Sequence, residues 1–184
     1  MLLTWILIGL AALIVIICFV YYNRFAILGN RIDNSLSQID VQLKRRADLI
    51  PNLLESVKGY MKHEKTVLTE VTKARTSFLN AKDMSSKVKA GDMMQNALKS
   101  IFAVAENYPQ LKASETFLQL QQELSTTEDK IAYSRQYYND SILTYENKRK
   151  TFPGNFFAGL YSFKQREYLQ IAESERKPVK VKFE

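Results

Sequence analysis

Hydrophobic and polar positions divide the chain into one uninterrupted apolar run and a longer body whose apolar residues recur at helical spacing. The run covers residues 1–22, contains no charged side chain, and has Thr4 as its one conventional polar residue. As a helix that rises about 1.5 Å per residue it reaches roughly 33 Å, enough to cross a hydrocarbon core of about 30 Å. The pattern therefore predicts a transmembrane anchor over residues 1–24.

The two ends of this run carry the side chains that membrane interfaces favour. Trp5 lies near one end, and Tyr21, Tyr22 and Arg24 lie at the other. A cleaved signal peptide would need a basic residue before the apolar core and small residues before the cleavage site, and neither is present. Lipoprotein processing at Cys18 is disfavoured because bulky Ile17 precedes it. We therefore expect an uncleaved anchor with these four residues at the interfaces.

Basic residues near the run lie on one side of it. None precedes it, whereas Arg24 and Arg31 follow it closely. Because loops that stay in the cytoplasm carry the excess of Lys and Arg, the N-terminus is expected outside and the body inside the cytoplasm. The sequence thus predicts a single-pass protein.

The body begins with a stripe of residues spaced alternately three and four apart, which is typical of a long helix with a heptad-like seam. The stripe keeps its phase through Pro51, so this proline should kink the helix and not end it. One helix is therefore expected to continue from the anchor as far as Phe78. The seam consists of Ile32, Leu36, Ile39, Leu43, Ala47, Ile50, Leu53, Val57, Tyr60, Glu64, Leu68, Val71, Arg75 and Phe78.

Two further helices are predicted after a polar turn over residues 80–86, where Asp83, Ser85 or Ser86 can act as the cap. The second ends at residues 107–109, and the third begins after Ser114 and continues to Tyr145. The three cytoplasmic helices would measure about 80, 35 and 55 Å. Because these lengths do not match, part of a seam would overhang, and a second copy or a partner helix could cover it.

A dense aromatic block, TFPGNFFAGLYSF, occupies residues 151–163. The favoured prediction is a short helix that folds back on the end of the bundle, and the alternative is a docking surface for a membrane interface or a partner. Residues 164–184 lack periodicity and are predicted to form a loosely ordered tail. The expected fold is all-α: a transmembrane helix continuing into an elongated antiparallel bundle of three long helices plus a short C-terminal helix, with the bundle over residues 25–163.

Charge adds one candidate surface. The chain has 26 Lys and Arg against 19 Asp and Glu, a formal net charge of +7, and all of these charges lie after the apolar run of residues 1–22. Most alternate in sign, as on a solvated helix face. The tightest basic cluster is Lys44, Arg45 and Arg46, for which an ion-pair network around Pro51 is the favoured interpretation. It lacks interleaved aromatic residues, so no nucleic-acid partner is predicted.

No pattern in the chain indicates catalysis. The single cysteine lies in the anchor, which leaves the body without a disulfide or a cysteine metal site. The single histidine, His63, has no second histidine at a zinc-protease or di-iron spacing. Phosphate-binding and nucleophile-elbow motifs are also missing. The sequence therefore predicts no catalytic, cofactor-binding or metal-ligating residue, and a protein that is not an enzyme.

Three long segments resemble the bacterial LemA family. They are RIDNSLSQIDVQLKRRADLIPNLLESVKGYMKHEK at residues 31–65, IFAVAENYPQLKASETFLQLQQELSTTEDKIAYSRQYYND at residues 101–140, and the aromatic block. The resemblance implies a single-pass protein of the bacterial cell membrane with an all-helical cytoplasmic bundle. The family has no established catalytic residues to transfer to this chain, and a relative implicated in building magnetosome membranes favours a scaffold over a catalyst.

Two functional hypotheses follow. The first is a non-catalytic scaffold, anchored in the bilayer and self-associating, that organises membranes or membrane proteins. The second is a cytoplasm-facing adaptor for one dedicated membrane partner, such as a peptidase or a signalling protein. Under either hypothesis the partners are lipid, a second copy or another membrane protein, without a cofactor. The candidate interaction residues are Lys44, Arg45, Arg46, Phe152, Phe156, Phe157, Tyr161 and Phe163.

Overall fold

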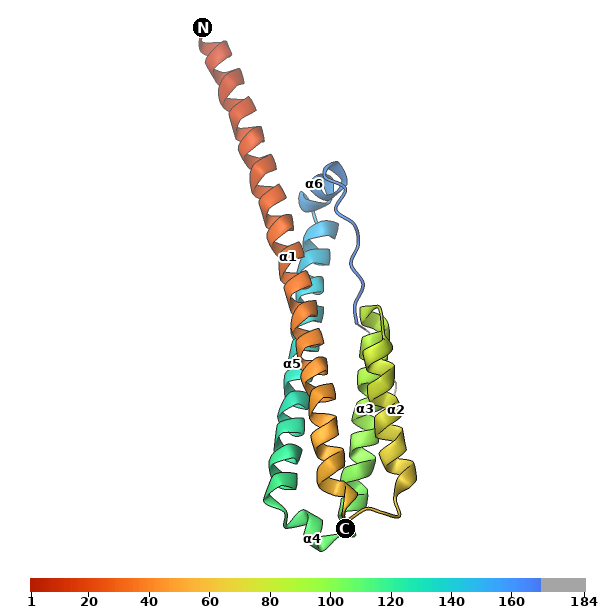
Figure 1. The fold of residues 1–184 in the computed structure, drawn as a ribbon. Helices are drawn as coiled ribbons and strands as arrows, with labels where there is room; N and C mark the ends of the chain where they lie inside the picture. The colour runs from red at the N-terminus through yellow and green to blue at the C-terminus, as the bar shows by residue number, and fades with distance from the viewer. Residues whose placement is uncertain (170–184) are drawn as a thin grey trace, which may run out of the picture. The chain divides into compact units, whose positions relative to one another are not determined.

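The computed structural model describes residues 1–169, and every regular element among these residues is a helix (Figure 1). In chain order they are α1 (Leu2–Lys58), α2 (Lys65–Asn80), α3 (Met84–Ala105), α4 (Pro109–Lys112), α5 (Glu115–Lys150) and α6 (Gly154–Leu160). The predicted all-α class is confirmed. The chain divides into two compact units, one of residues 1–36 and 135–168 and one built on residues 37–134.

Helix α1 is one uninterrupted element of 57 residues that contains Pro51. By length and composition it is the one helix among residues 1–169 that is able to cross a membrane. All residues from 1 to 17 are exposed, and the first fully buried side chain is that of Phe25. From there the predicted stripe turns inward, since Ile39, Leu43 and Leu53 are fully buried. The continuation of the apolar helix into the bundle is therefore confirmed.

The first unit joins the N-terminal part of α1 to the end of α5, to α6 and to the segment that follows α6 (Figure 1). Phe25 lies in its core, with its ring centroid 4.8 Å from that of Phe163 and 5.8 Å from that of Tyr145. The aromatic block thus folds back on α1 as a short helix, which the sequence favoured.

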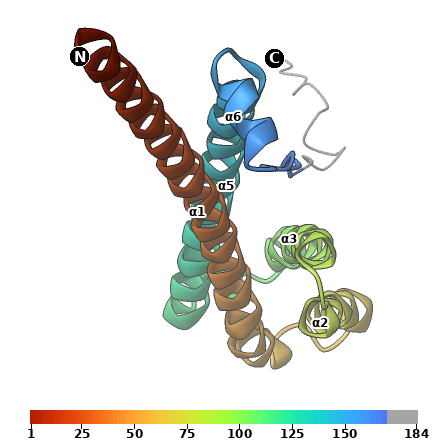
Figure 2. The same ribbon diagram turned by 90° about the horizontal axis from the view of Figure 1, so that it is seen from above.

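The second unit contains the rest of α1 and α5 together with α2, α3 and α4. Helices α2 and α3 pack side by side as a hairpin, which is seen end-on in Figure 2. The turn before α3 is capped as predicted: the carboxylate of Asp83 accepts from the backbone N–H of Ser86 at 2.9 Å and from its hydroxyl at 2.6 Å. These hydrogen bonds lower the pKa of Asp83.

The predicted end of the first helix is wrong. The helix ends at Lys58, and residues 59–64 form a turn before α2, so the seam predicted to run to Phe78 is folded into two helices. Two features stabilise this turn: the Met61 side chain is fully buried, and the Tyr108 hydroxyl donates to the Glu64 carboxylate at 3.3 Å. Burial, followed by the charge of Glu64, raises the pKa of Tyr108. The first helix is therefore shorter than predicted, whereas α2 and α3, with 16 and 22 residues, remain shorter than the 36 residues of α5.

Candidate functional site

An aromatic cluster joins the end of the apolar run to the C-terminal block, and we call it the aromatic collar. It consists of Tyr21, Tyr22, Phe25, Phe157, Tyr161 and Phe163. The rings of Tyr21 and Phe157 are stacked, with centroids 4.4 Å apart. The rings of Tyr22 and Tyr161 meet edge to face at 5.2 Å. Such pairs add about 0.5–1.5 kcal/mol each beyond the area that they bury.

Basic side chains stand beside the collar. The Lys148 ammonium lies 4.8 Å from the ring centroid of Tyr21, within cation–π distance. Arg149 and Lys150 follow it at the end of α5, and Arg24 and Lys164 are exposed in the same unit. The collar therefore carries positive charge where the apolar run ends.

The segment after α6 is tied to α5 by hydrogen bonds to its backbone. The Tyr145 hydroxyl donates to the carbonyl of Lys164 at 2.8 Å, and that of Tyr138 donates to the carbonyl of Glu167 at 3.0 Å. Burial raises the pKa of both phenols, which keeps them protonated as donors. Residues 164–167, which the sequence assigned to the loosely ordered tail, are thus held in place, while residues 170–184 lie outside the described residues.

Glu146 completes this attachment. Its carboxylate is 4% exposed, accepts from the Arg149 guanidinium at 2.9 and 3.0 Å, and accepts from the backbone N–H of Arg166 at 3.0 Å. Burial alone would raise the pKa of Glu146, but these donors together with the charges of Arg149 and Lys150 outweigh it and hold the pKa below its ordinary value. The carboxylate is therefore ionised at neutral pH.

The predicted basic cluster on α1 is divided by the fold. Lys44 and Arg45 are exposed, and Arg45 lies 3.7 Å from Glu123 of α5 with both side chains about half exposed. Arg46 is 2% exposed and pairs with Glu128 of α5. Its guanidinium also donates to the carbonyl of Gly91 at 3.4 Å, and Gln95 donates to the other Glu128 oxygen. Arg46 therefore belongs to the interior of the second unit and is not an accessible interaction residue.

The aromatic candidates are divided in the same way. Phe157, Tyr161 and Phe163 are buried or half-buried in the collar. Phe152 and Phe156 remain 86% and 65% exposed. Of the four interface candidates, Tyr21 and Tyr22 belong to the collar, and Trp5 and Arg24 are exposed on α1.

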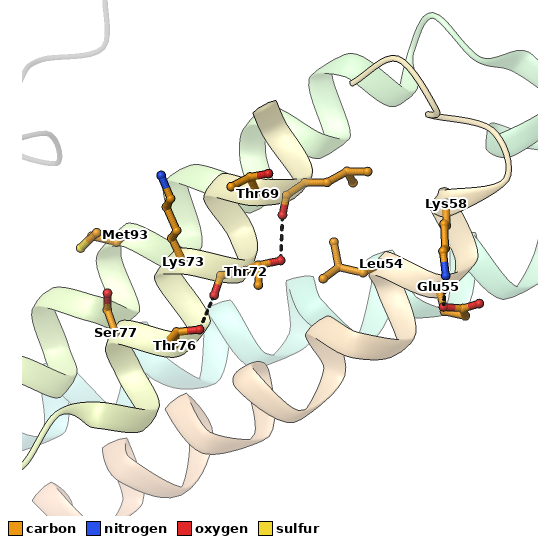
Figure 3. A pocket seen from close by; sticks show the side chains of 10 residues that line it. Leu54, Glu55, Lys58, Thr69, Thr72, Lys73, Thr76, Ser77 and Met93 are labelled. Carbon is orange, nitrogen blue, oxygen red and sulfur yellow. Dashed lines mark hydrogen bonds and ion pairs between the residues drawn. The ribbon is translucent and has the colours of Figure 1, made fainter. Parts of the chain in front are cut away.

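A groove of about 800 Å³ opens in the second unit between the end of α1 and α2 (Figure 3). Leu54, Glu55 and Lys58 of α1 line one side. Residues of α2 line the other, where Thr72 and Thr76 turn their hydroxyls to the carbonyls one helical turn before them. Because these hydroxyls are satisfied by their own helix, the groove offers an apolar floor with charged residues on its rim. Among residues 1–169, no group of three or more His, Cys, Asp or Glu side chains could hold a metal ion.

Comparison of sequences identifies the family. The sequence model of the LemA family matches residues 35–183, which is most of the chain. This chain belongs to the LemA family. Protein LemA of Metamycoplasma hominis is 31% identical over 162 residues, an alignment that covers 86% of this chain and 74% of that relative. The resemblance stated from the sequence motifs is confirmed.

Two curated relatives of this LemA-family chain are magnetosome proteins. Magnetosome protein MamQ 2 of Paramagnetospirillum magneticum is 24% identical over 184 residues, covering 86% of this chain and 68% of the relative. Magnetosome protein MamQ of Magnetospirillum gryphiswaldense is 22% identical with the same coverage. Family membership and the one long apolar helix found within residues 1–169 together support a membrane-associated protein.

The basic residues that end α5 in this LemA-family chain were not among the predicted site residues. The signal was present in the sequence, since NKRK at residues 147–150 directly precedes the aromatic block. Its importance was hidden because residues 21 and 148 are far apart along the chain. Only the folded first unit brings Lys148 over Tyr21.

The Glu146 contacts give a prediction for acid stability. Because the folded-state pKa lies below the ordinary value of 4.5, the ionised carboxylate stabilises the fold at neutral pH, and this contribution is lost as the pH falls from about 4.5 through the folded-state pKa. Glu146→Gln should cost about 1–2 kcal/mol at pH 7 and flatten the acid limb of a plot of melting temperature against pH. Glu115→Gln, at an exposed carboxylate, is the control. Equal acid limbs in wild type and Glu146→Gln would contradict the assignment.

Proposed function

We propose that this protein is a non-catalytic scaffold, anchored in the bacterial cell membrane, that assembles with copies of itself and organises membrane proteins around it. The observation that carries the proposal is the continuity of α1, which passes from an exposed apolar run into a buried core without a linker. A flexible linker would leave the bundle free to turn relative to the bilayer. A continuous helix joins the anchor directly to the core of the first unit, which begins at Phe25, and such a connection suits a structural protein.

The polar interior supports a non-catalytic role. Arg46, Glu128 and Gln95 are engaged with one another, and Glu146 is engaged with Arg149 and the backbone of Arg166. A catalytic group needs a free position that a substrate can reach. These groups instead bind to one another within the fold, and their role in this proposal is to stabilise it.

For orientation, we propose an N-terminus outside and a bundle in the cytoplasm. Arg24 and Arg31 follow the apolar run, in agreement with the excess of basic residues on cytoplasmic segments. The fold adds Lys148, Arg149 and Lys150 at the same end. Their positive charge suits the anionic lipid headgroups of the cytoplasmic leaflet.

The groove between α1 and α2 is the surface that we propose for self-association. A two-fold interface needs a surface that is complementary to itself. The groove supports such an interface because its rim carries both signs of charge, with Glu55 and Lys58 paired at 3.7 Å on α1 and Lys73 on α2. Exposed Met93 adds apolar surface at its edge. The occupant that fits is therefore the same groove of a second copy.

Single-cysteine crosslinking tests the proposal in cells. In a Cys18→Ala background, Lys73→Cys places a thiol on the groove and Lys130→Cys places one on an exposed position of α5. A short membrane-permeant bismaleimide should give a dimer through position 73 and little through position 130. A membrane-impermeant maleimide should block position 73 only in permeabilised cells. Equal crosslinking at both positions or none at either would remove the self-association, and blocking in intact cells would reverse the orientation.

The adaptor remains a second candidate because Phe152 and Phe156 stay exposed on the C-terminal block. It differs from the scaffold in stoichiometry. Recovery of one foreign membrane protein in equal amount with a monomeric chain, purified in mild detergent, would favour the adaptor over the scaffold.

A further inference from the structure

Three exposed apolar side chains project from the C-terminal block, and we call them the apolar foot. They are Phe152, Phe156 and Leu160, which are 86%, 65% and 57% exposed. The spacing of four residues places Phe156 and Leu160 on one face of α6. Burial of such side chains is strongly favourable, so a surface that leaves three of them uncovered is suited to an apolar environment.

The opposite face of α6 fixes the foot at a definite level along α1. Phe157 stacks on Tyr21, and the Tyr161 hydroxyl just after α6 donates to the backbone carbonyl of Cys18 at 3.3 Å. Residues 18 and 21 lie within the last turns of the apolar run. Helix α6 therefore lies beside the end of the segment that is able to cross the membrane, and not farther along the bundle.

Charge around the foot has the sign that lipid headgroups attract. Lys150, which is 66% exposed, closes α5 just before Phe152, whereas Arg149 beside it is paired with Glu146. Arg24 follows Tyr22 on α1, and Lys164 follows Phe163. Aromatic and aliphatic side chains flanked by Lys and Arg are typical of segments that lie in the plane of a membrane interface.

We propose that the apolar foot inserts into the interface of the same membrane leaflet from which α1 emerges. The bilayer is the occupant because its position follows from the fold: a membrane that surrounds the apolar run borders α6, which contacts that run at residues 18 and 21. The protein then touches one leaflet at two points, the anchor and the foot. This attachment does not depend on self-association.

Spin labels attached to the full-length protein measure whether the apolar foot is in contact with lipid or with water. In a Cys18→Ala background, Phe156→Cys carries the label at the foot, and Leu118→Cys carries it near the start of α5, where the native side chain is 50% exposed. The protein is reconstituted in vesicles of phosphatidylcholine mixed with phosphatidylglycerol. Collisions of each label with oxygen, which concentrates in lipid, and with a water-soluble nickel chelate are then compared.

The expected result is a reversal of preference between the two positions. The label at position 156 should collide more with oxygen, and the label at position 118 more with nickel. A nickel preference at position 156 would place the foot in water and overturn the proposal. Shielding from both reagents would mean that protein covers the foot, which also overturns it in favour of a partner or a second copy.

A label at a second position of the foot controls for the possibility that the label at position 156 disturbs the collar. Leu160→Cys lies on the same face and contributes no collar ring, so it should report the same oxygen preference. Far-UV circular dichroism of each labelled variant verifies its helix content. Failure of the oxygen preference at positions 156 and 160 alongside intact crosslinking through position 73 would remove the foot and leave the scaffold.

Discussion

Glu128→Ala is expected to lower the free energy of unfolding of the second unit by about 3 kcal/mol, because it removes the Glu128 carboxylate that pairs with the buried Arg46 guanidinium. Arg46 is 2% exposed, so its guanidinium is largely shielded from water in the folded protein. The carbonyl of Gly91, at 3.4 Å, is a weak substitute for a negative charge. Urea or thermal unfolding of the full-length protein in detergent, followed by circular dichroism, measures the loss.

Glu123→Ala is the matched control for this substitution. Glu123 also reaches from α5 to an arginine of α1, but it and Arg45 are both about half exposed and lie 3.7 Å apart. Exposed pairs of this kind are worth about 0–1 kcal/mol. The double variant Arg46→Met with Glu128→Leu should recover most of the stability, since it removes the buried Arg46 charge together with its partly exposed partner. Similar losses for Glu128→Ala and Glu123→Ala would show that burial of Arg46 does not determine the effect.

Phe25→Ala is expected to cost about 3–5 kcal/mol in the first unit and to loosen the C-terminal block. The ring is fully buried, stacks on Phe163 and meets Tyr145 edge to face, so its removal empties the centre of the collar. Faster protease cleavage between residues 151 and 168, together with a lower melting temperature, would report both effects.

Ile27→Ala is the control two residues away. The Ile27 side chain is 60% exposed on the same helix, and its truncation should change the free energy of unfolding by less than about 0.5 kcal/mol. If Phe25→Ala leaves the cleavage rate at its wild-type value, the collar does not hold the C-terminal block on α1.

The division of the basic cluster could have been anticipated in part. Arg46 lies next to Ala47 of the predicted stripe, and its spacing of three residues from Leu43 and four from Ile50 is also compatible with an inward position. The positive charge of Arg46 favoured an exposed side chain instead. The choice depended on a carboxylate 82 positions later in the chain, Glu128, and heptad spacing on one helix gives no information about that partner.

The turn at residues 59–64 shows a second limit of prediction from periodicity. The stripe of apolar and charged residues keeps its spacing across this turn, so periodicity alone favoured one helix. Gly59 is a weak helix former, but its cost of about 1 kcal/mol is small enough for packing to decide either way. Burial of Met61 and the contact between Tyr108 and Glu64 favour the turn, and Tyr108 lies 44 positions after Glu64, beyond what periodicity within one helix can report.

The aromatic block was predicted well because its signal is local. A proline and a glycine begin it, and its aromatic residues are dense enough to require a partner surface. Which of these residues face inward was not predictable. Phe156 and Phe157 are neighbours in the sequence, yet one is 65% exposed and the other 7%, because Tyr21 of α1 provides a ring on one side only.

The contacts of α6 with α1 have a consequence for adaptation to membrane thickness. Hydrophobic mismatch is usually relieved by tilting or sliding a single helix. Here one end of the apolar run is held at residues 18–25 by the collar, whereas residues 1–17 are exposed along their whole length. In a thicker or thinner bilayer, the position of the helix relative to the lipid should therefore change mainly at its N-terminal end, in the leaflet farther from the collar. Changes in anchor length are expected to be tolerated near Leu2, whereas a single inserted residue near Phe25 would turn the buried stripe by about 100°.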